Sequence, residues 1–223
     1  ANALSHRGPD GSGDWSDRNA CLAHKRLAIR DLSDEGNQPS FSRNKEIISV
    51  FNGEIYNYDE IKSVLEKKYN IEFKGHCDSE VIPKGFLVWG EEIFSKLEGI
   101  FAIALWDSLK KEFYLVRDGI GVKPLYFYQK DKRLLFGSEI KAICSVIGKP
   151  KILNEKSLHE FLSHGYIGNN QTMVNDLYQV PTGTILKFTK NNIEEKAFWQ
   201  PIRNGICNNN LIAQENFSNI FKE

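Results

Sequence analysis

The sequence lacks an excess of charge of either sign. Its 223 residues include 29 Lys and Arg and 29 Asp and Glu, so the formal net charge is zero. Proteins that bind nucleic acid or a membrane surface electrostatically carry clustered basic charge. The balance therefore predicts no nucleic acid and no membrane surface among the partners.

The sequence also lacks a long apolar run and a cleavable leader. A helix that crosses a membrane needs about 20 consecutive apolar residues. The opening residues, Ala1 to Leu4, form too short an apolar stretch for a signal peptide and have no basic residue before them. We therefore expect a cytoplasmic protein.

Cysteine is scarce and scattered. The four residues, Cys21, Cys77, Cys144 and Cys207, form no C-x-x-C pair and have no histidine at the spacing of a metal ligand. This pattern predicts no metal site and favours buried free thiols in a reducing compartment over disulfides. Glycine-rich phosphate-binding loops are absent as well, so we expect no cofactor in this domain.

What is present suits one domain with a substantial core, because 41% of residues are apolar and 12% are aromatic. Runs of β-branched and aromatic residues bounded by turns predict strands at 46–51, 99–107, 112–116, 125–129, 134–137 and 184–188. In the second of these, Phe101 and Ile103 alternate with Ala102 and Ala104, so both faces should be buried. The short connections indicate an antiparallel sheet.

Helical periodicity is clearest in the segment 59–69, where Ile61, Val64 and Leu65 share one face. We predict further helices at 79–89, with Asp78 as N-cap, at 138–146 and at 157–163. Strands and helices in this proportion predict an α+β sandwich. Beyond Trp199 the sequence is polar and aperiodic, so we expect a domain over 1–200 and a linker over 201–223.

The most informative segment is the end of the strand 46–51. It leads into Asn52 and Gly53, which offer a side-chain amide and a backbone N–H next to one another. Two converging donors form an oxyanion hole, which stabilises the negative oxygen that develops when a carbonyl is attacked. Asn-Gly is also a common hairpin turn, so this segment alone leaves two interpretations open.

Further motifs flank this segment. In chain order they are His6-Arg7-Gly8-Pro9-Asp10-Gly11, Ala23-His24-Lys25-Arg26-Leu27-Ala28-Ile29, Gly36-Asn37-Gln38-Pro39, Asp78-Ser79-Glu80-Val81-Ile82, Leu97-Glu98-Gly99-Ile100-Phe101-Ala102, Arg117-Asp118-Gly119-Ile120-Gly121-Val122-Lys123-Pro124-Leu125-Tyr126 and Gly137-Ser138-Glu139. The series resembles the glutaminase domain of glutamine-dependent asparagine synthetases, within the class II glutamine amidotransferases. The resemblance extends from His6 to about Trp199. It implies the N-terminal nucleophile hydrolase fold, a four-layer αββα sandwich of two antiparallel sheets between helical layers.

The resemblance also implies a glutamine site. Arg26 would hold the α-carboxylate, for which a planar guanidinium fork is suited, and Asp78 would hold the α-ammonium. The glutamine-binding residues implied in this way are Arg26, Leu27, Ala28, Ile29, Asn52, Gly53, Glu54 and Asp78, with Asn52 and Gly53 as the oxyanion hole. The structural alternatives are a surface ion pair for Arg26 and a simple helix cap for Asp78.

The nucleophile in the resembled family is an N-terminal cysteine whose own α-amine, with a pKa of about 8, serves as base. This sequence begins at Ala1, and neither Cys21 nor Cys77 has a free α-amine, so we expect both to pack in the core. The chain as written should then not hydrolyse glutamine. Truncation is the simpler explanation, and a natural pseudoenzyme or an upstream serine nucleophile are the alternatives.

The resemblance implies hydrolysis of glutamine to glutamate and ammonia. A C-terminal synthetase domain that uses ATP and Mg, and whose start would lie within 201–223, would take the ammonia, most simply to make asparagine from aspartate. A homodimer is compatible with this. Another acceptor, such as a surface-polysaccharide sugar acid, and a non-catalytic glutamine-binding module remain alternatives. Arg117-Asp118 and Lys123-Pro124 are interpreted either as a docking face for that domain or as a solvated turn.

Overall fold

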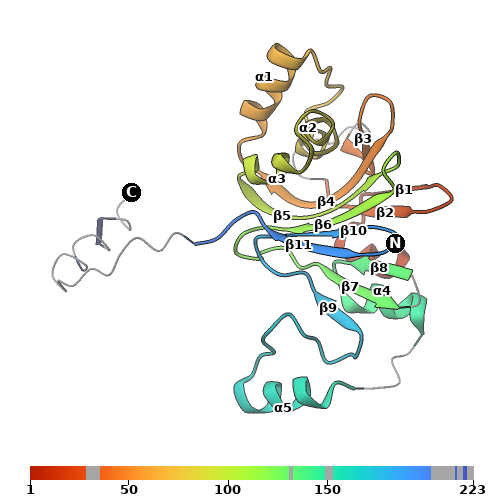
Figure 1. Cartoon of the computed structure of the whole chain (residues 1–223), viewed down its shortest axis with the longest axis vertical. Coiled ribbons are helices and arrows are strands. Elements are labelled where there is room, and N and C mark those ends of the chain that lie inside the picture. The colour runs from red at the N-terminus through yellow and green to blue at the C-terminus, as the bar shows by residue number, and fades with distance from the viewer. Residues whose placement is uncertain (29–35, 131–132, 149–152, 202–213, 215–217, 220–223) are drawn as a thin grey trace.

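The computed structural model describes residues 1–28, 36–130, 133–148, 153–201, 214 and 218–219, and it forms four layers (Figure 1). One helical layer covers a large sheet, a small sheet lies against the other face of that sheet, and a helix lies beyond the small sheet. The helices are η1 (Asn2–Arg7), α1 (Tyr58–Tyr69), η3 (Asp78–Glu80), α2 (Val81–Trp89), η4 (Gly90–Glu92), α3 (Ile93–Lys96), α4 (Ile140–Ile147) and α5 (Glu155–His164). The predicted αββα sandwich is confirmed.

The large sheet has six antiparallel strands in the order β11-β10-β6-β5-β4-β3. Their bounds are β3 (Ser40–Phe41), β4 (Ile47–Ile55), β5 (Gly99–Asp107), β6 (Glu112–Arg117), β10 (Thr184–Phe188) and β11 (Ile193–Ala197). Strand β4 pairs with β5 along all nine of its residues, whereas β3 covers only two of them on the other side. Much of one edge of β4 is therefore left without a neighbouring strand.

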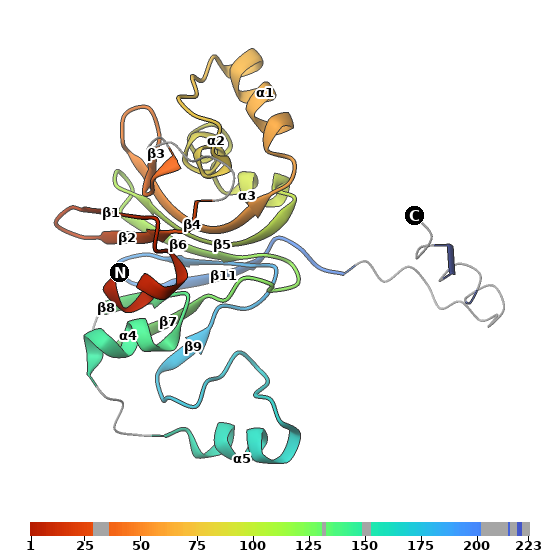
Figure 2. The same cartoon turned by 180° about the vertical axis from the view of Figure 1, so that it is seen from behind.

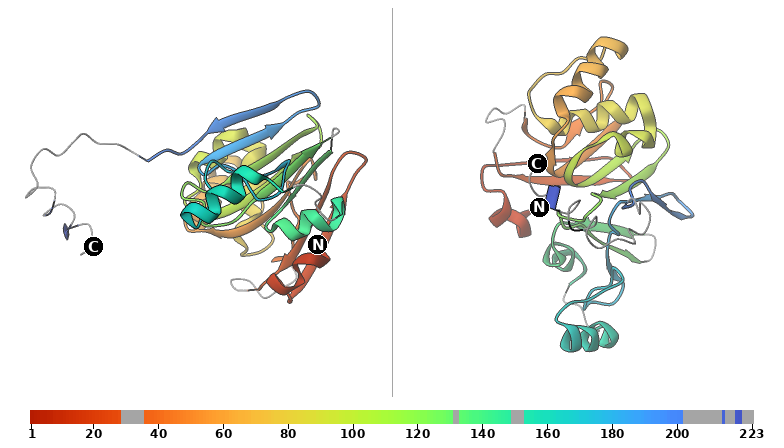
Figure 3. Two further views of the ribbon diagram at one scale, coloured as in Figure 1. Left: turned by 90° about the horizontal axis from the view of Figure 1, so that it is seen from below. Right: turned by 90° about the vertical axis from the view of Figure 1, so that its left-hand side faces the viewer.

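Two smaller sheets complete the framework. Strands β7 (Tyr126–Lys130), β8 (Arg133–Gly137) and β9 (Leu177–Gln179) form an antiparallel sheet in the order β8-β7-β9, and β1 (Gly11–Ser16) pairs with β2 (Cys21–Arg26) as a hairpin. Helix α4 covers the three-stranded sheet, and α5 lies at the far end of the molecule in both opposite views (Figures 1 and 2). Seen from below, the blue β11 edge and the red hairpin lie on opposite sides (Figure 3).

The alternation along β5 divides the core in two. Phe101 and Ile103 belong to the apolar cluster between the large sheet and the helices, together with Phe51 of β4. Ala102 and Ala104 belong to the cluster between the two sheets. Both faces of β5 are buried, as predicted from its sequence.

The predicted strands and helices are present, β5 and β10 with the predicted ends and the others with shifted ends. One shift changes the interpretation of the site. Strand β4 does not stop at Phe51 but continues to Ile55, so Asn52 and Gly53 lie inside a strand and the hairpin-turn alternative is wrong. The pairing with β5 continues through Asn52 and Gly53, which keeps both residues in the strand. Sequence analysis did not identify β1, β2, β3, β9 and β11, which are short or polar.

Two smaller expectations also change. Cys21 is exposed rather than buried, while Cys77 and Cys144 are partly buried; these three are free thiols, and Cys207 lies outside the described residues. Asp118 is 1% exposed, and its carboxylate accepts from the backbone N–H groups of residues 101 and 120–123. The turn is therefore bonded internally through Asp118, while Ile120 and Val122 on it are exposed.

The remaining expectations concern the chain's ends and its compartment. The predicted linker over 201–223 falls almost entirely outside the described residues. Across the described part of the chain, no helix combines the length and apolarity that a membrane crossing requires.

Candidate functional site

A cavity of about 570 Å³ opens where the ends of β2 and β4 meet the segment that enters η3. The residues implied by the resemblance that line it are Arg26, Leu27, Asn52, Gly53, Glu54 and Asp78. Ala28 is not among the lining residues, and its N–H donates to Asp10 Oδ2 at 2.9 Å. Ile29 lies outside the described residues. Tertiary structure thus brings residues from three separated motifs to one hollow.

The uncovered edge of β4 presents a row of backbone N–H groups to this region. The backbone N–H and C=O groups of alternate residues in a strand bond to opposite sides. In β4 the backbone groups of the odd-numbered residues face away from β5. Three of these groups donate to buried side chains: Ile47 to Ser42 Oγ (3.0 Å), Phe51 to Gln38 Oε1 (2.6 Å) and Ile55 to Asp78 Oδ2 (2.9 Å). Gly53 N–H belongs to the same row, and no described side chain accepts from it.

Asn52 supplies a second donor beside Gly53. Its side chain lies on the same face of β4 as Val50, towards the space between the two sheets. Its Nδ2 is buried and has no hydrogen-bond partner among the described residues. A buried amide donor without a partner costs free energy, so its retention beside a cavity points to a ligand acceptor.

Position 53 requires a glycine because the backbone of β5 approaches it closely. A Cβ at this position would overlap the carbonyl oxygen of Ile100 on β5, and the φ angle of 156° is one that side chains rarely adopt. The glycine therefore lets β4 stay paired with β5 while its N–H remains directed at the cavity.

Arg26 ends β2 and is buried, with 8% of its surface exposed. The guanidinium donates to Asn37 Oδ1 at 3.2 Å and lies flat against Gly36, where any Cβ would overlap it. Burial of this kind excludes the surface ion-pair interpretation. The same packing fixes the orientation of the guanidinium that lines the cavity.

Asp78 is buried as well, at 6% exposure, and does not cap a helix. One carboxylate oxygen accepts from the Ile55 N–H of β4, which ties the start of η3 to the strand. Glu54 lies on the exposed rim of the cavity. One guanidinium and two carboxylates around a small cavity are suited to a zwitterion such as a free amino acid.

Cys77 lines the cavity next to Asp78 but is not suited to be a nucleophile. Burial raises the pKa of its thiol, and the Asp78 carboxylate raises it further against the opposing effect of hydrogen bonds from Ser79. A thiol that stays protonated at neutral pH attacks amides poorly.

His24 is a lining residue that sequence analysis did not single out. Burial lowers the pKa of its imidazole to about 4, so the ring is neutral near pH 7. One ring nitrogen hydrogen-bonds the Phe51 backbone, and Nδ1 is buried without a partner among the described residues. Gln38 was likewise missed as a functional residue, although both belong to motifs that carried the resemblance. No local signal in the sequence shows that these side chains converge on Phe51.

Comparisons with known proteins agree with this geometry. The chain is 31% identical over 220 residues to a putative glutamine-hydrolysing asparagine synthetase 2 of Methanocaldococcus jannaschii, an alignment that covers 89% of this chain and 42% of the relative. It is 34% identical over 176 residues to asparagine synthetase B of Escherichia coli, covering 78% and 30%. The chain thus spans less than half the length of these relatives.

Among solved structures, the glutamine phosphoribosylpyrophosphate amidotransferase of B. subtilis, complexed with ADP and GMP, superposes with a TM-score of 0.61. The two are 20% identical, and the match covers 92% of this chain and 47% of that one, so this similarity concerns the fold. The family model of the glutamine amidotransferase domain matches residues 1–199. The chain therefore belongs to the glutamine amidotransferase domain family, in its class II branch with the glutamine-hydrolysing asparagine synthetases.

Proposed function

We propose that the cavity binds L-glutamine and that this domain hydrolyses the side-chain amide to glutamate and ammonia. The observation that carries the proposal is the pair of donors on β4, Asn52 Nδ2 and Gly53 N–H, in the same cavity as buried Arg26 and Asp78. The pair suits an amide carbonyl, and the charged residues suit the two ends of an amino acid.

The expected chemistry follows from these roles. Arg26 holds the α-carboxylate, and Asp78, with Glu54 nearby, holds the α-ammonium, so the side chain of glutamine extends towards β4. When a nucleophile attacks the amide carbon, the carbonyl oxygen becomes negative, and Asn52 and Gly53 donate to it. Donors that are already fixed stabilise this oxyanion without reorganisation at the moment of reaction.

The nucleophile that the resemblance implies is a cysteine with a free α-amine, which takes up the thiol proton and returns it to the leaving ammonia. No described cysteine fits, since each lies inside the chain and the thiol of Cys77 has a raised pKa. The described residues therefore account for binding and for oxyanion stabilisation. A glutamine-binding module without hydrolysis is the alternative function.

The fate of the ammonia is proposed from the relatives. Several are named as glutamine-hydrolysing asparagine synthetases and are more than twice as long as this chain. We propose that the ammonia passes to a synthetase domain that uses ATP and Mg to convert aspartate to asparagine. An acceptor other than aspartate, such as a sugar acid, is the competing proposal.

Calorimetric titration with L-glutamine tests the binding proposal. Asp78→Asn keeps an oxygen that can accept from Ile55 N–H but removes the charge for the α-ammonium, so the fold should persist while affinity falls. Arg26→Lys keeps the charge but loses the planar fork. Each should weaken binding about tenfold or more, because hydrogen bonds to charged groups are the strong ones.

The control is Arg133→Ala, at an exposed position on β8, which should bind glutamine like the unchanged chain. Equal affinity in Asp78→Asn and the unchanged chain would contradict the assigned role. Ammonia release by the full-length natural protein then separates the two functions, since binding without release would establish the binding module.

A further inference from the structure

The side chain of Gln38 takes the place of a backbone strand beside Phe51. In the β3–β4 ladder Ser40 lies opposite Ser49, and continuing that register by two residues places Gln38 opposite Phe51. At this point the Gln38 carboxamide replaces the ladder: Oε1 accepts from Phe51 N–H at 2.6 Å and Nε2 donates to the Phe51 carbonyl at 3.0 Å. Gln38 is 8% exposed, so both hydrogen bonds are shielded from water.

The β1–β2 hairpin holds this arrangement from the other side. Gly13 approaches the Gln38 carbonyl so closely that a Cβ there would overlap it. His24, which pairs with Gly13 in the hairpin, hydrogen-bonds the Phe51 backbone through its ring. The backbone of one residue of β4 is therefore held by two side chains from two different segments.

Phe51, which is held in this way, directly precedes the two donors Asn52 and Gly53. Ser49 pairs with β3, and Ile55 N–H donates to Asp78. Between these two residues, Gln38 is the side chain among the described residues that accepts from the outer edge of β4. A rotation of the backbone at Phe51 would turn both donors that follow it. A displacement of about 1 Å at a catalytic group can cost two orders of magnitude in rate.

We propose that Gln38 is a positioning residue that fixes Asn52 Nδ2 and Gly53 N–H for the carbonyl of the bound amide. The inference rests on the proposed glutamine function, because it assigns Gln38 a part in that same site. Gln38 lines the cavity, but both polar groups of its carboxamide bond the Phe51 backbone, so it acts through that backbone and not by contact with substrate.

The variant that tests this is Gln38→Met, which keeps an unbranched side chain of similar length and removes both hydrogen bonds to Phe51. The matched control is Ser42→Ala. Ser42 is also buried and also accepts from the outer row of β4, at Ile47, but at the opposite end of the strand from the donor pair. Gln38→Glu is a second variant, which keeps the acceptor for Phe51 N–H and sets a carboxylate oxygen against the Phe51 carbonyl.

The first measurement is the ¹H–¹⁵N NMR spectrum of the ligand-free chain. The Asn52 side-chain amide and the Gly53 backbone amide should change position or broaden in Gln38→Met and Gln38→Glu, and should stay in place in Ser42→Ala. Unmoved signals in a folded Gln38 variant would overturn the proposal, whether or not the chain binds glutamine.

The second measurement compares L-glutamine with L-norvaline, which has the same amino and carboxylate groups but no amide carbonyl. The unchanged chain should prefer glutamine, and Gln38→Met should lose about tenfold of that preference while its affinity for norvaline is retained. Ser42→Ala should keep the preference. An unaltered preference in Gln38→Met would refute the positioning role, whereas failure of the unchanged chain to bind either amino acid would refute the proposed function and leave the NMR comparison to decide on Gln38.

Discussion

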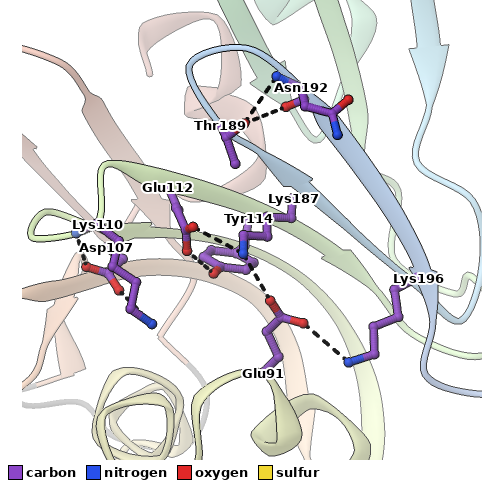
Figure 4. A network of polar contacts seen from close by, with 9 residues as sticks. All are labelled: Glu91, Asp107, Lys110, Glu112, Tyr114, Lys187, Thr189, Asn192 and Lys196. Carbon is purple, nitrogen blue, oxygen red and sulfur yellow. Dashed lines mark hydrogen bonds and ion pairs between the residues drawn. The ribbon is translucent and has the colours of Figure 1, made fainter.

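The two edges of the large sheet are protected in opposite ways. At the β3 edge, buried side chains bond the uncovered backbone of β4: Gln38, Ser42 and Asp78, each less than 10% exposed. At the other edge every residue of β11 is exposed, and the strand is flanked by charged side chains (Figure 4). An unpaired edge invites association with other chains, and exposed charge is the common safeguard.

The difference explains where the site lies. The buried side chains that accept from β4 each have a fixed geometry, and they leave the N–H group of Gly53 without a side-chain acceptor among the described residues. The contacts near the β11 edge are ion pairs between long side chains: Lys187 of β10 lies 3.1 Å from Glu112 and 3.6 Å from Glu91, and Lys196 of β11 lies 3.4 Å from Glu91 (Figure 4). A binding site needs fixed donors, so the edge with buried caps is the one that can hold a ligand.

The strongest way to disturb the β3 edge is Gly53→Ala. The new Cβ would overlap the Ile100 carbonyl, so β4 must separate from β5, and we expect unfolding free energy to fall by about 3 kcal/mol or more. Chemical denaturation measures this. Gly90→Ala is the control, because Gly90 also has a positive φ but open space around it, and should cost about 1 kcal/mol. Similar losses in both variants would contradict the assigned crowding.

Acid should weaken the same edge through His24. Its pKa falls from the ordinary 6.5 to about 4 on folding, so between these values the unfolded chain binds a proton that the folded chain does not. Stability should therefore drop as pH falls through this window, by about 2 kcal/mol between pH 7 and pH 5. His24→Gln should flatten that dependence.

The control for this measurement is His159→Gln, at an exposed position on α5, which should leave the slope unchanged. A pH dependence that is identical in His24→Gln and in the unchanged chain would assign the acid sensitivity to other groups.

A smaller effect is expected among the polar contacts near the β11 edge, which join Glu91, Glu112, Tyr114, Lys187 and Lys196. Tyr114 is 1% exposed, and its hydroxyl donates to Glu112 Oε2 at 2.7 Å (Figure 4). Tyr114→Phe should cost about 1 kcal/mol near pH 7, because it removes one hydrogen bond to a carboxylate. Burial acts to raise the pKa of Glu112, but hydrogen bonds from Tyr114 and Lys187 and nearby lysine charges together lower it. The cost should therefore shrink as pH falls below the ordinary value of 4.5. A cost that persists undiminished in acid would show that packing, not this bond, is affected.

The smallest effect belongs to the exposed edge itself. Lys196 has 64% of its side chain exposed, and its ion pair with Glu91 is screened by solvent. Lys196→Ala should change unfolding free energy by no more than about 0.5 kcal/mol. A loss comparable to that of Tyr114→Phe would erase the distinction drawn between the two edges.

Sequence alone determined the layered architecture and the positions that could recognise glutamine. Alternation along Phe101 to Ala104 is a local property of the strand, and it specified burial on both faces because a strand's side chains must point to opposite sides. The ordered motifs likewise specified the family and placed Arg26, Asn52 and Asp78 among the candidates. Both depend on residue type and order, which the sequence contains in full.

Tertiary structure decided how the candidates are held. Strand β4 runs on through Asn52 and Gly53 because β5 offers a paired backbone there, which outweighs the local preference of Asn-Gly for a turn. Gln38 and His24 meet at Phe51 although they lie far from it along the chain, and no local pattern encodes which backbone group a distant side chain will bond. The sequence therefore named the donors of the candidate site, and the packing of two strands and a hairpin against β4 determined where those donors point.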